Sequence, residues 1–253
     1  MTIDDLPVVR DVPSVTAAQM AEIDRRCATE FALGTELLME NAAHQIARAA
    51  RAFLGGRVTG KRIVALIGPG NNGGDAAGAL RHLANWGANV LAIVGAKQER
   101  LRETTRIQVN RLLIATSSHP AVVRDATVMT PVELPACDLV LDGLLGFSAK
   151  GAPRDSIRDL VAASNRAGFP MLAVDIPSGM DADTGVAPGE VIRAAATVTL
   201  ALPKTGLRAP AAREFVGTLL LADIGVPHLA LEHLGVDTRD LFKDGDLIRI
   251  LPA

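Results

Sequence analysis

The stretch RIVALIGPGNNGGD, residues 62–75, decides the fold of this chain. Its apolar run Ile63–Ile67 leads into a glycine-rich segment, and a helix-like stretch, Ala76–Trp86, follows. An apolar run that is bounded by turn residues and followed by a helix is typical of one unit of a parallel sheet. We therefore expect a strand, a loop over Gly68–Asp75, and a helix that starts at Asp75.

The same alternation continues along the chain. Helix-like stretches at Arg100–Ala115 and Asp155–Ala167 separate further apolar runs, which are Val90–Val94, Leu139–Leu141, Met171–Val174, Val198–Ala201 and Leu219–Ala222. Strands that alternate with helices predict an α/β fold whose mostly parallel sheet is covered on both faces. No repeat or linker divides the sequence, so we expect a single domain over 1–253, with a core at about 14–228 and a less periodic tail at 229–253 that wraps the surface.

Two helices are expected before the first strand. Thr16 and Gln19 have the spacing of a capping box, and apolar residues follow them with helical periodicity. Thr35 is placed to cap the second helix, which Gly55 and Gly56 would end. We expect this pair to pack on the sheet or on a second subunit.

The composition excludes several classes of protein. Apolar residues make up 49% of the chain and charged residues 21%, as in ordinary globular proteins. The net charge of -2 offers no basic field, so we expect no nucleic-acid partner. No apolar run approaches the roughly 18 residues of a membrane helix, and no signal peptide is visible, so we expect no membrane partner and a cytoplasmic location. Cys27 and Cys137 are expected to be buried core residues rather than a disulfide.

The glycine-rich loop partly matches a dinucleotide-binding fingerprint. Glycines 68, 70 and 73 satisfy G-x-G-x-x-G, but the acidic residue wanted near the end of the second strand is missing, and the first acid is Glu99. Asp75 would also repel a phosphate by roughly 4 kcal/mol at about 4 Å, against a gain of roughly 0.3–1 kcal/mol at a helix start. The loop is better suited to hydroxyls, amides or a metal ion. The alternative is a plain turn whose glycines adopt positive φ.

Three apolar runs end in an aspartate, namely Asp142, Asp175 and Asp223. Ligands of open parallel sheets bind outside the carboxyl ends of the strands, so these carboxylates could meet at a cation or do acid–base work. Asp223 precedes Gly225 and is better read as part of a turn. Lys150, in a glycine-bearing loop after Asp142, could contact phosphate or transfer protons.

Taken together, these segments resemble the NAD(P)H-hydrate epimerase family. The motifs are LLMENAA (37–43), GPGNNGGD (68–75), DLVLDGLLGFSAKG (138–151), AVDIPSGMDADTG (173–185) and TLALPKTGL (199–207). The resemblance runs from about Ala17 to about Pro227 and implies a Rossmann-like three-layer fold with an N-terminal helical segment, usually dimeric. Alanines at 76 and 77 and a glycine at 143 depart from the family pattern without removing a motif oxygen. Some members carry a fused dehydratase domain, whereas we expect a stand-alone epimerase domain here.

The resemblance also implies a substrate and a cofactor. The substrate is NADHX or NADPHX, the hydrated forms of NADH and NADPH, whose R and S epimers at the 6-hydroxyl centre are interconverted in nicotinamide nucleotide repair. The cofactor is K+, and its ligands would include Asn72, Asp142 and Ser178. Substrate contacts would come from Asn71, Asn72, Gly73, Gly74, Asp75, Gly146, Phe147, Ser148, Ala149, Lys150, Gly151, Ala152 and Asp175.

We expect Asp175 to act as the acid–base group, with Lys150 as its possible partner. Two other functions remain open from the sequence. A dinucleotide-dependent oxidoreductase is disfavoured by the missing second-strand acid. A non-catalytic nucleotide- or protein-binding module of the same fold is disfavoured by the intact polar motifs.

Overall fold

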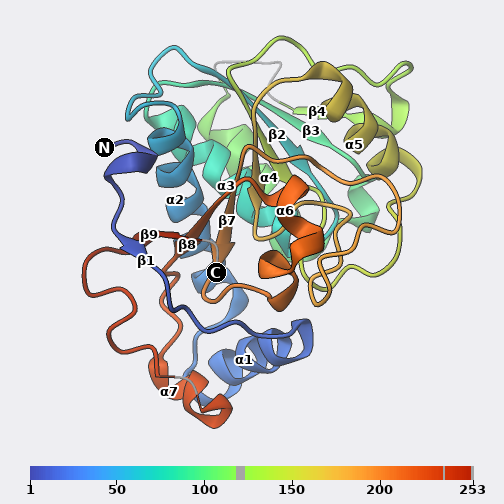
Figure 1. The fold of residues 1–253 in the computed structure, drawn as a ribbon. Helices are drawn as coiled ribbons and strands as arrows, with labels where there is room; N and C mark the ends of the chain where they lie inside the picture. Colours follow the sequence, from blue (N-terminus) through green and yellow to red (C-terminus); the bar gives the residue numbers. More distant parts are fainter. Residues whose placement is uncertain (118–122, 236, 252–253) are drawn as a thin grey trace.

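The computed structural model describes residues 1–117, 123–235 and 237–251, and its described residues form a nine-stranded sheet (Figure 1). The strands lie side by side in the order β1-β9-β8-β7-β6-β5-β2-β3-β4. Neighbouring strands are parallel except β8 and β9, which are antiparallel. The bounds are β1 (Val8–Val9), β2 (Arg62–Ile67), β3 (Asn89–Val94), β4 (Val123–Asp125), β5 (Leu139–Gly143), β6 (Met171–Val174), β7 (Ala196–Leu200), β8 (Thr218–Ala222) and β9 (Leu247–Ile250).

Helices cover both faces of this sheet. The α-helices are α1 (Ala17–Glu30), α2 (Thr35–Phe53), α3 (Asn71–Asn85), α4 (Glu103–Ala115), α5 (Asp155–Ala167), α6 (Arg213–Val216) and α7 (His228–Leu231). Short 3-10 turns are η1 (Ile3–Asp5), η2 (Gln98–Arg100), η3 (Ala126–Val128), η4 (Thr205–Arg208), η5 (Pro210–Ala212) and η6 (Glu232–Leu234). The α/β, Rossmann-like prediction with an N-terminal helical segment is confirmed.

The two-residue period of the strands decides which helices pack where. On β2, Ile63 and Ile67 join the core that contains α2, α3 and α4, whereas Leu66 points to the opposite face. There it packs with Leu160 of α5, because successive side chains of a strand point to opposite faces. Both faces of β2 are therefore buried, as expected for a parallel strand.

The first two helices differ in how they begin. Thr16 caps α1 as expected, since its hydroxyl accepts from Gln19 N at 3.2 Å and its own N–H donates to the Gln19 side chain at 2.8 Å. The expected cap at Thr35 is wrong, because the N-cap residue of α2 is Gly34 and Thr35 is already helical. Figure 1 shows α1 at the lower end of the molecule, next to α7.

Two further expectations are corrected. Helix α3 begins at Asn71 rather than at Asp75, so most of the expected loop is the first turn of a helix. The tail beyond residue 228 does not only wrap the surface, because Leu247–Ile250 form the strand β9 beside β8. A run of four residues is too short for its period to stand out in sequence, and pairing with β8 decides its conformation.

The strand order places one switch point beside the glycine-rich segment. From β2 the chain moves outward through β3 and β4, then returns so that β5 lies on the other side of β2. The connections after β2 and β5 run in opposite directions, and this leaves a crevice at the carboxyl ends of the two strands. Ligands of such sheets bind in this crevice. The segments after Ile67 and Gly143 border that crevice.

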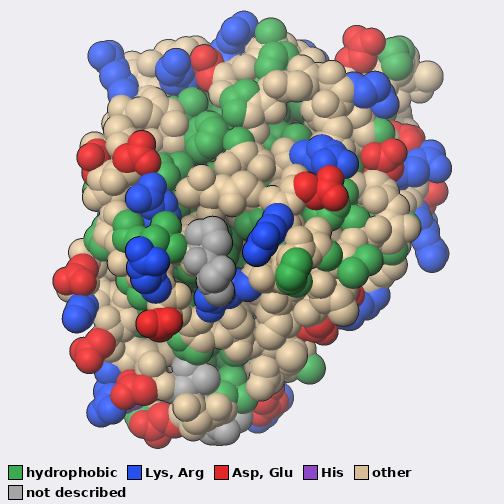
Figure 2. Space-filling model, viewed as in Figure 1, with side chains coloured by type: hydrophobic (Ala, Val, Ile, Leu, Met, Phe, Trp, Pro, Cys, Tyr) green, Lys and Arg blue, Asp and Glu red, His purple; other side chains and the backbone are tan. Residues whose placement is uncertain are grey.

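The cysteines, the surface charges and the helices can be compared with the composition. Cys27 and Cys137 are both buried and unpaired, as expected. Figure 2 shows basic and acidic side chains interspersed over the face in view. Within the described part of the chain, no helix is both long enough and apolar enough to span a membrane.

Candidate functional site

The glycines of the switch point allow two backbones to touch. Gly68 N donates to Gly143 O at 3.1 Å, and a Cβ on Gly68 would lie 1.7 Å from the carbonyl oxygen of Leu144. A Cβ on Gly73 would lie 2.2 Å from the carbonyl oxygen of Gly68. None of the glycines 68, 70, 73 and 74 has a positive φ. Glycine is therefore required at 68 and 73 by the close approach of other backbone atoms, and not by a left-handed turn.

Asn72 spans the crevice from the first turn of α3. Its Nδ2 donates to the carbonyl oxygens of Leu145, at 3.0 Å, and Val174, at 3.1 Å. Because both neighbours are acceptors, the amide nitrogen must face them, and the side-chain oxygen is left for another partner. One buried side chain thus joins the segments that follow β2, β5 and β6.

Asp142, at the end of β5, is fully buried. Its carboxylate accepts from Ser178 Oγ at 2.6 Å, from Ser178 N at 2.8 Å and from Leu144 N at 3.2 Å. Burial raises the pKa of Asp142 to about 6, although these three hydrogen bonds act in the opposite direction. Ser178 Oγ also accepts from Leu145 N at 2.8 Å. The structure therefore brings Asn72, Asp142 and Ser178 together around Leu145.

Asp175 follows β6 and is paired with a residue that the sequence reasoning did not select. Lys204 Nζ donates to its Oδ1, and Thr199 Oγ1 and Leu200 N lie 3.3 Å from the same oxygen. Lys204 is 1% exposed and Asp175 is 4% exposed. Asp175 also has a φ of 67°, which is uncommon for a residue other than glycine. Such strain often occurs at functional sites.

Lys150, the expected partner of Asp175, contacts other carboxylates. Its exposed Nζ lies 3.4 Å from both Asp181 and Asp183. Asp183 also accepts from Ala17 N at 2.6 Å, which ties this loop to the start of α1. Lys150 therefore sits at the rim of the site, and its catalytic role stays a prediction.

The other expected contact residues divide into two groups. Within Asn71–Asp75, Gly73 and Gly74 are buried against other segments of the fold, and the Oδ1 of Asn71 accepts from Thr104 at 3.1 Å. The second group surrounds the loop after β5, where Gly146 lies beside Asn72 and the Phe147 ring centroid is 5.5 Å from Lys204 Nζ. Of the rest of this loop, Ala149 is half-buried, and the exposed residues are Ser148, Lys150, Gly151 and Ala152.

Asp75 and Asp24 complete a group of carboxyl groups around Lys204. Asp75 is 8% exposed, and burial together with repulsion from Asp175 and Asp24 raises its pKa well above the usual range. Asp24 lies on α1 with its side chain exposed, and partial desolvation raises its pKa to about 6. Lys204 opposes both shifts. Among the described residues no hydrogen-bond donor contacts the Asp75 carboxyl.

Two hollows lie near the ends of the strands, and neither is lined by Lys204, Asp175, Asp75 or Asp24. A hollow of about 330 Å³ lies beyond β7 and β8, with Ala201 and Asp223 in its lining. Asp223 Oδ1 accepts from Gly225 N at 2.8 Å, which matches the expected turn. A larger hollow of about 390 Å³ lies at the opposite edge of the sheet, beside Arg62 and Asn89, and is not part of this site.

A mostly parallel α/β sheet with buried polar groups at its topological switch point defines a Rossmann-like ligand-binding protein. More specifically, the chain belongs to the family described as YjeF-related protein N-terminus, whose model matches residues 35–206.

Relatives from several organisms extend this assignment. NAD(P)H-hydrate epimerase of Dehalogenimonas lykanthroporepellens is 35% identical over 240 residues, which cover 94% of this chain and 93% of that protein. NAD(P)H-hydrate epimerase of Rhodopirellula baltica is 34% identical over 231 residues, 90% of this chain and 91% of that protein. The match to the bifunctional NAD(P)H-hydrate repair enzyme Nnr of Moorella thermoacetica, 35% identical, covers 87% of this chain but 42% of that protein.

The fold is shared with a solved structure. The crystal structure of the yeast protein ynu0, YNL200c, superimposes with a TM-score of 0.76 at 24% identity, over 94% of this chain and all of that chain. At this identity the likeness concerns the fold.

Sequence reasoning missed two members of the site, Lys204 and Asp24. Lys204 lies within the motif TLALPKTGL, three positions beyond the apolar run Val198–Ala201, and this position was its only signal. Asp24 lies on a polar face of α1, where nothing separates it from other surface acids. Only the packing of α1 near the carboxyl ends of the strands gives it a place in the site.

Proposed function

We infer that this chain catalyses the NAD(P)H-hydrate epimerase reaction, the interconversion of the R and S epimers of NADHX and NADPHX. The observation that carries this inference is the match to relatives of that name over nearly the whole of both chains. The geometry supports it, because the family motifs, distant in sequence, converge at one crevice. The oxidoreductase and the non-catalytic module are thereby less favoured.

We propose that the substrate lies along the carboxyl ends of β2, β5, β6 and β7. The expected contacts at Asn71–Asp75, Gly146–Ala152 and Asp175 border this path. Inversion at C6 requires either that the hydroxyl leaves and returns or that the ring opens. Asp175 is the proposed acid–base group, because it is buried beside a cation in the middle of the path.

Potassium fits the donor set around Asn72, Asp142 and Ser178. All three residues offer oxygen, the ligand that hard cations prefer. Asp142 carries the one negative charge of this set, which suits a monovalent ion, and a cation would offset the burial penalty on its carboxylate. Groups of three or more His, Cys, Asp or Glu side chains arranged for a metal do not occur among the described residues. Bound there, potassium would supply positive charge that orders the three loops.

The decisive experiment starts from the two separated epimers of NADHX or NADPHX. The wild-type protein should convert either epimer into the same mixture, which chromatography can follow. Asp175→Asn should slow this conversion by about 10²–10⁴-fold, the usual contribution of general acid–base catalysis. Full activity of Asp175→Asn would remove its assigned role, and failure of the wild type to convert either epimer would remove the function.

We also propose that the enzyme is a cytoplasmic homodimer, as the family resemblance implies. Light scattering coupled to size-exclusion chromatography should give twice the 26.4 kDa mass of the chain. A mass of one chain at micromolar concentration would contradict the dimer. Cell fractionation tests the location separately.

A further inference from the structure

We propose that Lys204 is a positioning residue that keeps Asp175 as an ionised base, and that Asp75 is the protonated acid that faces it. This inference rests on the proposed function and assigns separate roles to two carboxyl groups of the same site. Its basis is the geometry of the charged group formed by Lys204, Asp175, Asp75 and Asp24.

Lys204 is fixed in place from both its ends. Its ammonium group donates to Asp175 and to Leu200 O, the latter at 3.1 Å, and faces the Phe147 ring. Its backbone forms a β-bridge with Val15, and Thr205 N donates to Val15 O at 2.9 Å. Lys204 is 1% exposed and its ammonium group is held by these contacts, so its side chain cannot turn outward into solvent. The positive charge therefore stays beside Asp175.

Three donors converge on one oxygen of Asp175. Besides Lys204, the hydroxyl of Thr199 and the N–H of Leu200 both point to Oδ1 at 3.3 Å. Hydrogen bonds to a carboxylate and a cation in contact with it both stabilise the ionised form. We therefore assign the role of the base to Asp175.

Asp75 has the opposite surroundings. It is 8% exposed, and no donor from the described residues reaches its carboxyl. The charged groups that face it are Asp175 and Asp24, which repel its negative form, and Lys204, which is already engaged by Asp175. Three carboxyl groups share one lysine, so the one that is buried without a donor retains its proton. Two carboxyls whose surroundings separate their proton affinities are the pattern of an acid and a base.

The chemistry of epimerisation uses these two roles in turn. The Asp75 carboxyl gives its proton to the C6 hydroxyl, the C6–O bond breaks, and water leaves as the N1 lone pair forms an N1=C6 double bond. Water then adds to the other face of C6, the π electrons return to N1, and the proton released goes to Asp175. Transfer of that proton from Asp175 to Asp75 through solvent restores the enzyme. Atoms and electrons balance, and no oxidant or reductant is needed.

Asp75→Asn tests the acid directly. The amide keeps the shape of the carboxyl but has no acidic proton, so kcat should fall by about 10²–10⁴-fold. In parallel, the infrared C=O band of a protonated carboxyl should be present in wild type at neutral pH and lost in Asp75→Asn. Activity within threefold of wild type, or a band unchanged by the substitution, overturns the assignment of Asp75.

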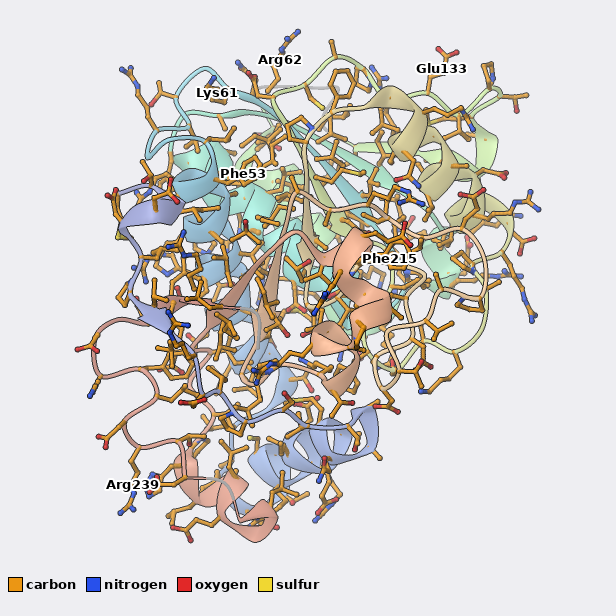
Figure 3. The ribbon with its side chains drawn as sticks, viewed as in Figure 1. Phe53, Lys61, Arg62, Glu133, Phe215 and Arg239 are labelled. Atoms are coloured by element: carbon orange, nitrogen blue, oxygen red, sulfur yellow. The ribbon has the colours of Figure 1, made fainter. Side chains whose placement is uncertain are left out.

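Lys204→Met tests the positioning role through the pH profile. Without the cation Asp175 is protonated more readily, so the acidic limb of kcat/KM should move to higher pH. The matched control is Lys61→Met, which removes a lysine paired with Asp138 at 3.4 Å. Figure 3 shows Lys61 at the other end of the molecule from Arg239, near the amino end of β2. The control should keep the wild-type profile, and an unmoved limb in Lys204→Met overturns the role.

A structural role alone would lower stability without moving that limb. If circular dichroism shows that Lys204→Met does not fold, Lys204→Gln replaces it, because a neutral amide can still donate to Asp175. The same displacement of the acidic limb is then expected. The outcomes stay separable from the proposed function: a wild type that epimerises while the variants behave as controls overturns only this inference, and a wild type without activity overturns the function while the infrared band still reports on Asp75.

Discussion

The side-chain nitrogen of Asn72 donates to the carbonyl oxygen of Leu145 at 3.0 Å, across the switch in strand order. This contact joins the first turn of α3 to the loop after β5, and a second bond from the same nitrogen reaches Val174, at the end of β6. Buried amides are stable only when their donors are satisfied, so the position of Asn72 and the path of both loops depend on each other. The site is therefore a single packed unit.

The close approach at Gly68 can be tested with one methyl group. Gly68→Ala would place a Cβ 1.7 Å from the Leu144 carbonyl oxygen, and we expect a loss of about 1–3 kcal/mol or more in the free energy of unfolding. Gly70→Ala is the matched control, because its Cβ would meet nothing within 4 Å. Urea denaturation measures both variants. Equal stability of the two would contradict the packing described for this turn.

Potassium should stabilise the folded protein. A ligand that binds only the native state adds about 2.7 kcal/mol at a concentration 100 times its dissociation constant. We expect the melting temperature to be higher in potassium chloride than in choline chloride of equal ionic strength. Asp142→Asn should reduce this difference, since it removes the charged member of the donor set. An equal melting temperature of the wild type in the two salts would contradict the proposed potassium site.

Asp24 should make stability depend on pH. Its pKa is raised to about 6 in the folded protein by partial desolvation, against 3.8 for the ordinary value. A carboxyl with a raised pKa stabilises the fold most when both states are protonated, and this contribution is lost as the pH rises from about 4 to about 6. The wild type should therefore lose more stability over this interval than Asp24→Asn. Parallel pH curves from thermal melts would contradict the prediction.

The two cysteines should react slowly with thiol reagents. Burial raises the pKa of Cys137 to about 11 and raises that of Cys27 as well, and the thiolate is the reactive form. At pH 8 the native protein should be labelled far more slowly than the protein in guanidinium chloride, where both thiols should react. Rapid labelling of the native protein would show that one of the two sites opens readily.

Sequence patterns reach only part of the site. The motifs around Asn72, Asp142 and Ser178 could be selected because each combines turn residues with oxygen donors after an apolar run. Lys204 could not be assigned to Asp175 from the sequence, because 29 positions separate the two residues. A strand-end lysine and a loop lysine look alike until the neighbours of each are known. For this reason Lys150 was expected to be the partner of Asp175, whereas the lysine in contact with Asp175 is Lys204.

The sequence by itself determined the alternation of strands and helices, the capping of α1 at Thr16, and the chemical nature of the switch-point residues. These features depend on side-chain periodicity and on local backbone preferences, which act over a few residues. The tertiary structure alone decided that α3 begins at Asn71, that β9 joins the sheet, and that Lys204 meets Asp175. Such contacts form between segments that are distant in sequence. Their free energy depends on how those segments pack, which a pattern of a few neighbouring residues cannot reveal.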